Sequence, residues 1–291
     1  DAESAPIYND FGQSLPGLES GFRRAKLSWY TIDPVFYAET PGGLTPQDIG
    51  YNSTRRIYSD ELYPVTDIVQ GQSQVVSTLD LTYYPNERGP YNFNPAAAAT
   101  NGFSALDARN NFGGIMRAIN STNFEQSNVE YIQFWMLDPY VDQFNPNAPQ
   151  QTNTGKIVFN LGSISEDVLK DGRKQYENGL GNNVVLVQPP SVWGDIPASQ
   201  SLIYAFDVDG GNRGQQDVGF DGLNDAQEAQ RFPAAFAGFE DPAQDNYRYY
   251  LNASGSIQER YKQYNGLEGN SPVEVGNTNR GATTVPDVED I

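Results

Sequence analysis

Two apolar segments with a two-residue period, on either side of a polar loop, most constrain the fold of this chain. Residues 128–141 read NVEYIQFWMLDPYV, and residues 155–162 read GKIVFNLG. Successive side chains of a strand point to opposite faces. In the first segment both faces are apolar, with Phe134 on one and Trp135 on the other, whereas in the second the apolar face is that of Phe159. We expect two central strands of a β-sandwich, whose aromatic side chains form its core.

The content of glycine and proline agrees with an all-β chain. With 28 Gly, 19 Pro and 12% aromatic residues, the composition indicates short strands joined by turns and long loops. The predicted fold is a β-sandwich of the jelly-roll, galactose-binding-like type, with long loops and a few short helices. We expect an irregular arm over residues 1–21, the sandwich domain over 22–265, and a polar C-terminal linker over 266–291.

Further elements are predicted along the chain. Residues 25–37 are densely apolar but contain Pro34, which lacks an N–H, so two short pieces that meet at this proline are expected. Residues 75–84 alternate as a half-buried strand, and residues 256–264 have helical spacing. Residues 85–111 hold turn formers and predict a long surface loop.

The charge and the missing residue types exclude several classes of function. The 37 Asp and Glu against 18 Lys and Arg give a net charge of −19, which repels nucleic acid and anionic membrane surfaces. Without Cys or His the chain has no disulfide, no thiolate nucleophile, no Ser-His-Asp triad and no common zinc ligand. The absence of an apolar run of about 18 residues predicts that these residues hold no transmembrane helix and no export signal.

The densest functional signal is residues 207–228, DVDGGNRGQQDVGFDGLNDAQE. Counted from Asp217, the spacing is that of a 12-residue Ca²⁺ loop, with Gly222 at the sharp turn and Gly219 where a third carboxylate is missing. This pattern predicts a structural Ca²⁺ that holds a loop in place. An ordinary β-turn without an ion is the alternative. The predicted ligands are Asp207, Asp209, Asp217, Asp221, Leu223, Asp225 and Glu228.

Two other functions use residue types that this chain contains. A glycoside hydrolase needs two carboxylates roughly 5–10 Å apart, one with a raised pKa. Glu125, Glu130 and Asp138 are candidates, but any acidic β-protein offers as many. We expect Glu130 and Asp138 to face solvent or cap a turn, and we predict no enzyme. Trp193 and Tyr91 lie in predicted loops and would offer a sugar-stacking platform, so a calcium-stabilised carbohydrate-binding module is the alternative function, although burial is the commoner fate of such residues.

Several long strings occur in order over most of residues 22–291. They are RAKLSWYTIDPVFY (24–37), LDLTYYPNERGPYNF (79–93), GGIMRAINSTNFEQSNVEYIQFWMLDPY (113–140), NLGSISEDVLKDGRKQYENGL (160–180), QDVGFDGLNDAQE (216–228) and VPDVEDI (285–291). These strings closely resemble the SprA/Sov family of Bacteroidota, whose members form the outer-membrane translocon of the type IX secretion system and in gliding species also serve surface motility.

The resemblance implies that this chain is an internal, soluble and non-enzymatic segment of a much longer protein. Its role would be to shape the secretion conduit or to dock partners. The expected partners are other translocon subunits and secreted protein cargo, with no nucleic acid among them. The expected location is the outer membrane, where the parent protein spans the bilayer while this segment lies on its extracellular or periplasmic side. The resemblance carries over no catalytic residue.

Overall fold

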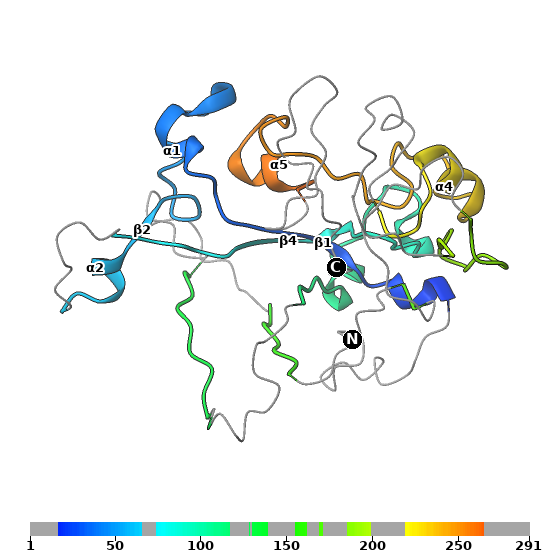
Figure 1. The fold of residues 1–291 in the computed structure, drawn as a ribbon, viewed down its shortest axis with the longest axis horizontal. Coiled ribbons are helices and arrows are strands. Elements are labelled where there is room, and N and C mark those ends of the chain that lie inside the picture. Colours follow the sequence, from blue (N-terminus) through cyan, green and yellow to red (C-terminus); the bar gives the residue numbers. More distant parts are fainter. Residues whose placement is uncertain are drawn as a thin grey trace.

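The computed structural model describes residues 17–65, 74–116, 128, 130–138, 155–161, 169–170, 185–198 and 219–264 (Figure 1). Within these residues the helices are few and short, and the strands form two small antiparallel sheets, as in a mostly-β protein. The helices are α1 (Val35–Glu39), α2 (Ser59–Leu62), α4 (Asp225–Arg231) and α5 (Ile257–Tyr261). The strands are β1 (Ala25–Tyr30), β2 (Ile57–Tyr58), β3 (Val75–Val76) and β4 (Asp80–Arg88).

The main sheet pairs β1 with β4 in antiparallel register, from Ala25 opposite Arg88 to Tyr30 opposite Asp80. A bulge lies between Ala25 and Lys26. β1 ends before Pro34, as the sequence predicts, but the second piece is helix α1 instead of a strand. The second sheet is the short pair β2 and β3, near α2 at one end of the described chain (Figure 1).

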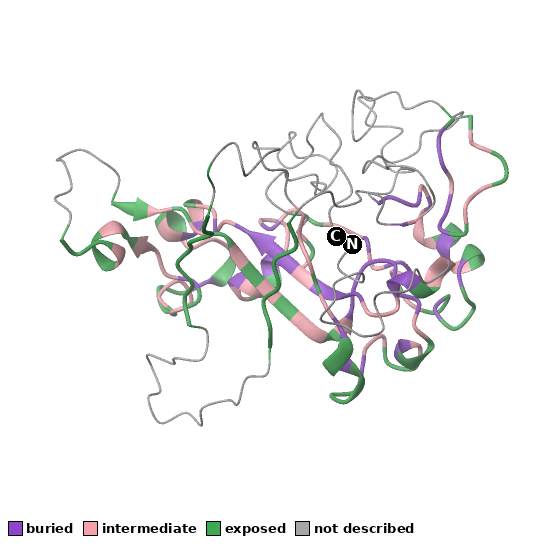
Figure 2. Cartoon of the chain, turned by 90° about the horizontal axis from the view of Figure 1, so that it is seen from below, coloured by how far each residue is buried: buried purple, intermediate pink, exposed green. Residues whose placement is uncertain are grey.

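β4 is half-buried, as expected from its alternation (Figure 2). Its polar side nevertheless faces inward, while Leu81 on the other side is 53% exposed. Thr82 hydrogen-bonds the Tyr30 hydroxyl at 3.0 Å, and the Tyr84 hydroxyl donates to the Gln258 carbonyl oxygen at 3.4 Å. Since Gln258 belongs to α5, the hydroxyl-bearing side of β4 faces this helix.

Two clusters of buried aromatic and aliphatic side chains form the interior. One surrounds the inner face of β1 and α5, and its buried members are Tyr30, Ile32, Phe36, Leu44, Tyr250, Ile257 and Tyr261. The other joins residues 91–93 to the C-terminal part of the described chain, and its buried members are Tyr91, Phe93, Leu169, Trp193, Phe220, Leu223, Phe232, Phe236 and Ala243. The prediction of a long surface loop over 85–111 is therefore wrong at Tyr91 and Phe93, which are buried and pack against the distant rings of Phe220 and Phe232 respectively.

Residues 130–138 and 155–161 are the described parts of the two segments predicted as central strands. Neither of these described segments forms a strand, and large side chains such as Trp135 are exposed. They do approach each other, with 5.3 Å between the ring centroids of Phe134 and Phe159. The expected burial is wrong for these residues, because no described strand or helix covers their alternating faces.

The ends of the predicted domain are partly described. Residues 1–16 and the predicted linker 266–291 lie outside the described residues, while Gly17–Gly21 form a 3₁₀ turn where an irregular arm was expected. The predicted helix near residue 256 is confirmed as α5, which Ser256 and Glu259 cap reciprocally. Among the described residues, no helix has the length and apolar character that crossing a bilayer requires.

Candidate metal centre

Helix α4 positions the acidic residues of the candidate site. Its N-cap Asn224 and Gln227 form a capping box, with hydrogen bonds of 3.0 and 3.1 Å between side chain and backbone in both directions. Asp225 and Glu228 are three residues apart in the first turn and therefore lie on neighbouring positions of one side. Their carboxylates complement the positive end of the helix dipole. Before the helix, Gly222 has a φ of 67°, which fits the predicted sharp turn.

Three buried carboxylates converge beside α4. Asp221, Glu228 and Asp245 are each exposed by 1% or less. One oxygen from each lies within 4.8 Å of the corresponding oxygens of the other two. A second group consists of Asp225, Glu228 and Asp241 and has the same spacing, with Glu228 common to both. The two groups place five carboxylates in one small region, which is costly unless positive charge is nearby.

Each buried carboxylate is oriented by a hydrogen bond to one of its oxygens. The donors and acceptors are Leu223 N to Asp221 Oδ1 at 2.9 Å, Ala243 N to Glu228 Oε2 at 2.8 Å, and Tyr91 Oη to Asp245 Oδ2 at 2.8 Å. The other oxygen of each carboxylate is buried and accepts no hydrogen bond from the part of the chain that the structure describes. Backbone and tyrosine donors therefore hold the three groups in place.

Tyr91 connects this cluster to the aromatic core. Its hydroxyl accepts a hydrogen bond from Phe220 N at 2.6 Å while it donates to Asp245. Burial raises the pKa of Tyr91 well above its ordinary value, and the Asp245 and Asp221 charges raise this pKa further. The hydroxyl therefore keeps its proton and acts as a donor at neutral pH.

Arg88 supplies positive charge to the same region. Its buried guanidinium donates to the carbonyl oxygens of Asn92 at 2.9 Å and Pro242 at 2.6 Å. Burial lowers the pKa of Arg88 to about 10, while the charges of Asp241, Glu228 and Asp245 act in the opposite direction. The guanidinium remains charged at neutral pH and offsets part of the negative charge.

Gly219 explains why a carboxylate is missing from the third position of the predicted loop. A Cβ at this position would lie 2.1 Å from Asp245 Oδ2 and 2.9 Å from Tyr91 Oη. A side chain there would displace the Asp245–Tyr91 pair. Asp245, which is remote in sequence, thus occupies the space beside the loop that a third-position ligand would fill.

The structure brings together only some of the predicted ligands. Asp221 and Glu228 belong to the buried group, and Asp225 belongs to the second group. Leu223 contributes its backbone N–H to Asp221. Asp207, Asp209 and Asp217 lie outside the described residues.

The sequence reasoning missed Asp241 and Asp245, because a 12-residue loop pattern registers only local spacing. The acidic run EDPAQDN at residues 240–246 was the available signal.

The donor set allows a test of whether a metal ion fits. Ca²⁺ binds oxygen ligands at about 2.3–2.6 Å, so two ligands of one ion are separated by no more than about 5 Å. The mutual limit of 4.8 Å for the three carboxylate oxygens satisfies this condition. Carboxylates are hard ligands that favour hard cations. The buried cluster can therefore hold a metal ion, in a position that is enclosed by the fold.

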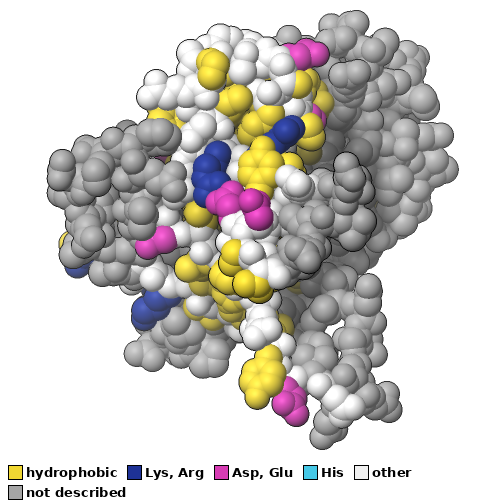
Figure 3. All heavy atoms as spheres, turned by 90° about the vertical axis from the view of Figure 1, so that its left-hand side faces the viewer, with side chains coloured by type: hydrophobic (Ala, Val, Ile, Leu, Met, Phe, Trp, Pro, Cys, Tyr) yellow, Lys and Arg dark blue, Asp and Glu magenta, His cyan; other side chains and the backbone are white. Residues whose placement is uncertain are grey.

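The two residues considered for sugar binding are interior, and the two described acids considered for catalysis are on the surface. Trp193 and Tyr91, the candidates for a sugar-stacking platform, are fully buried. Glu130 and Asp138 are exposed, as expected for solvated acids, and Glu125 lies outside the described residues. The described part of the face that carries β2 and α2 mixes acidic, basic and hydrophobic side chains (Figure 3).

No known family profile and no curated protein matches this chain.

Proposed function

We propose that this chain is a non-enzymatic structural domain of an outer-membrane translocon for protein secretion, of the type IX class, which shapes the conduit or docks partner subunits and cargo. The strings that resemble the SprA/Sov family support this proposal, and so does the acidic composition, which suits contact with proteins more than with nucleic acid. The lack of His and Cys removes the commonest catalytic groups.

The observation that carries the structural role is how the buried polar groups are used. Tyr91 donates a hydrogen bond to Asp245, and Arg88 donates one to the carbonyl oxygen of Pro242; in both pairs the partners are 154 residues apart in sequence. Glu228 accepts a hydrogen bond from the backbone N–H of Ala243. Each of these side chains is fully or almost fully buried. Groups enclosed in this way hold chain segments together, whereas catalytic groups must reach a substrate.

The proposed ion at the carboxylate cluster is Ca²⁺. Oxygen-only donors and the fit of their spacing to calcium–oxygen distances support this choice. Asp207, Asp209 and Asp217 are proposed as additional ligands from the preceding segment. The ion would join the loop before α4 to the segment that carries Asp245, and it would balance charge that Arg88 leaves uncompensated.

The proposed fold of the domain within the complete protein is a jelly-roll sandwich. Residues 130–138 and 155–161 have the sequence alternation of buried strands. The rings of Phe134 and Phe159 already bring the two segments into contact. In the assembled translocon, neighbouring strands would pair with these two segments and cover their apolar side chains.

The translocon role is tested in the bacterium that encodes the parent protein. An in-frame deletion of residues 22–265 should abolish secretion of cargo, while a tagged parent protein should fractionate with the outer membrane together with other secretion subunits. Normal secretion by the deletion strain, with the truncated parent protein present at wild-type abundance, would contradict the proposal.

The metal is tested on the purified chain by thermal unfolding. EDTA should lower Tm, and Ca²⁺ should restore it at a lower concentration than Mg²⁺. The reason for the shift is mass action, since a ligand that binds only the folded state stabilises it by about 2.7 kcal/mol at 100 times its Kd. Identical melting curves in EDTA and in Ca²⁺ would refute the calcium site and leave the translocon role to its own test.

A further inference from the structure

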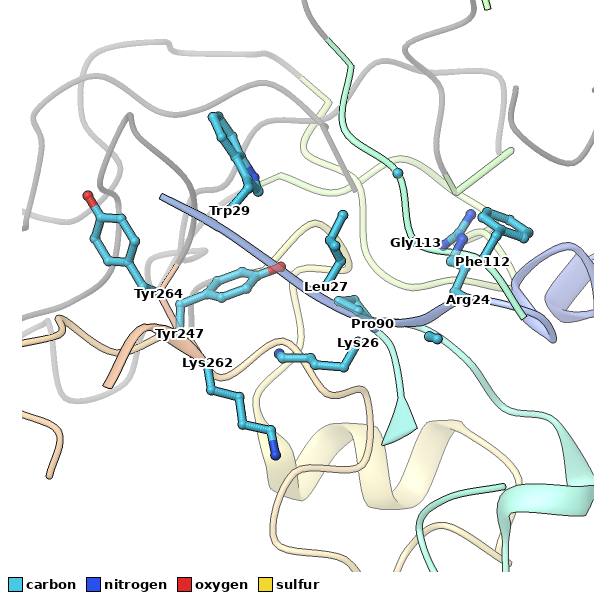
Figure 4. Close-up of a pocket in the computed structure, with 12 residues that line it drawn as sticks. Arg24, Lys26, Leu27, Trp29, Pro90, Phe112, Gly113, Tyr247, Lys262 and Tyr264 are labelled. Carbon is cyan, nitrogen blue, oxygen red and sulfur yellow. The ribbon is translucent and has the colours of Figure 1, made fainter. Parts of the chain in front are cut away.

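A small pocket lies between the start of β1, residues 112–114 and the segment 247–264 (Figure 4). Its volume is about 40 Å³. The wall combines basic and aromatic side chains, chiefly Arg24, Lys26, Trp29, Tyr247, Lys262 and Tyr264. Its lining residues, all of them in the described part of the chain, include no Asp or Glu. In a protein with a net charge of −19, this is an unusual gathering of positive charge.

Lys26 is the central basic residue of this pocket. It follows the bulge in β1, and bulges redirect side chains. The residue is only 8% exposed, and its amino group extends toward Tyr247 and Lys262 (Figure 4). The amino nitrogen lies 5.9 Å from the centre of the Tyr247 ring, and Lys26 forms no hydrogen bond or ion pair with a described residue. Lysines that are buried to this degree are almost always paired.

The other two cations are engaged elsewhere. The amino nitrogen of Lys262 lies 2.6 Å from Glu87 Oε2 and 4.6 Å from the centre of the Tyr84 ring. The guanidinium of Arg24 lies 5.8 Å from the centre of the Trp193 ring. Lys26 is thus the cation directed into the pocket, and one positive charge calls for an anion with one negative charge.

The size of the pocket selects among monovalent anions. A void needs roughly 10–15 Å³ to hold one water molecule. The pocket, with its volume of about 40 Å³, therefore accommodates a group of about three heavy atoms. A carboxylate has three heavy atoms, whereas a phosphate has five and carries more charge. The aromatic rings of Trp29, Tyr247 and Tyr264 suit the apolar carbon to which a carboxylate is attached.

We propose that Lys26, within this pocket, binds a carboxylate group. The ammonium would donate charge-assisted hydrogen bonds to the carboxylate oxygens. The inference does not depend on the translocon role.

Burial and neighbouring charges of both signs act on Lys26. Burial lowers the pKa of Lys26, and the charge of Lys262 lowers it further, while the charges of Asp241, Asp245 and Glu87 raise it. A bound anion would favour the charged ammonium and thereby offset the cost of burial. Carboxylate binding should consequently stabilise the folded chain.

The test is acetate binding to the whole chain, measured by calorimetry and by Tm at constant ionic strength, with chloride as the reference anion. Acetate should raise Tm of the wild type and of the control Lys156→Met, which changes an exposed lysine. Lys26→Met should lose at least tenfold in acetate affinity. Because this variant removes a buried charge, its Tm without acetate should equal or exceed that of the wild type.

Lys26→Gln provides a second uncharged variant in case Lys26→Met folds poorly.

The carboxylate could belong to a peptide C-terminus or to a small molecule, and a trialanine peptide and its C-terminal amide distinguish these sources. Tighter binding of the free peptide than of acetate identifies a chain terminus. Equal binding of the two identifies a small carboxylate. An acetate response that persists in both Lys26 variants, or that is absent in the wild type, overturns the proposal.

Discussion

The hydroxyl of Tyr91 donates a 2.8 Å hydrogen bond to Oδ2 of Asp245, although 154 residues separate the two in sequence. Both side chains are almost fully buried. The same hydroxyl accepts from Phe220 N, so one atom connects three distant parts of the chain. This bond relates the aromatic core to the acidic cluster, and it shows why Tyr91 is interior in a region whose composition predicts a loop.

Tyr91→Phe should destabilise the fold by about 1–3 kcal/mol, because it removes a buried donor and leaves Asp245 and the Phe220 amide with one partner fewer. Urea denaturation measures the change. Tyr131→Phe is the matched control, since Tyr131 is 79% exposed and its variant should unfold as the wild type does. Equal unfolding midpoints for the wild type and Tyr91→Phe would show that the bond does not stabilise the fold.

Arg88→Met should lower the free energy of unfolding by about 3–5 kcal/mol, because it removes positive charge near the buried carboxylates. It also removes hydrogen bonds to the backbone carbonyl oxygens of Asn92, Pro242 and Asp241 and to the side chain of Asn101. The control is Arg55→Met, which breaks a more exposed ion pair with Glu61 at 2.9 Å and should cost no more than about 1 kcal/mol. Denaturant unfolding of the two variants gives the comparison. If Arg88→Met lowered the free energy of unfolding by as little as Arg55→Met does, the result would argue against a role of Arg88 in offsetting the buried negative charge.

Asp245→Asn should weaken Ca²⁺ binding by about tenfold or more, which corresponds to ~1.4 kcal/mol, because a charged ligand becomes neutral. In EDTA the variant should be at least as stable as the wild type, since repulsion within the cluster falls. Calorimetry with Ca²⁺ and melting in EDTA provide the two readouts. Asp60→Asn is the control, as Asp60 is exposed and remote from the cluster. Unchanged Ca²⁺ affinity in Asp245→Asn would exclude Asp245 as a ligand.

Stability should fall as pH rises from 10 to about 12. Burial raises the pKa of Tyr30 from 10 to about 12, and the Asp80 charge raises it further, while the Thr82 hydrogen bond lowers it. In this window the unfolded chain loses the tyrosine proton before the folded chain does, so ionisation favours unfolding. Urea midpoints at several pH values test this. Tyr30→Phe should show a shallower decline than the wild type, and an equally steep decline would assign the effect to other groups.

Local sequence signals anticipated local structure well. The helical spacing of residues 256–264 predicts α5, and Pro34 separates β1 from α1 as expected. The turn at Gly222 also follows from its place in the loop pattern. These features depend on interactions within a few residues, so a sequence window contains both partners.

Whether a side chain is buried depended on residues that are far away in the sequence and lie outside any short sequence window. Alternation in residues 130–138 matches a buried strand, yet Trp135 is exposed because no described element covers it. Tyr91 lies among turn formers, yet distant aromatic rings enclose it. For the same reason the loop pattern found Asp221 and Glu228 but missed Asp245.

The sequence by itself determined the chemical repertoire of this protein: an acidic chain without His or Cys, with carboxylates clustered ahead of a helix start. Only the tertiary structure decided which carboxylates meet, that Arg88 offsets part of their charge, and that Lys26 is enclosed in a basic pocket. The physical reason is that hydrogen-bonding capacity and charge belong to each residue type, whereas burial and proximity arise when segments far apart in the chain pack together.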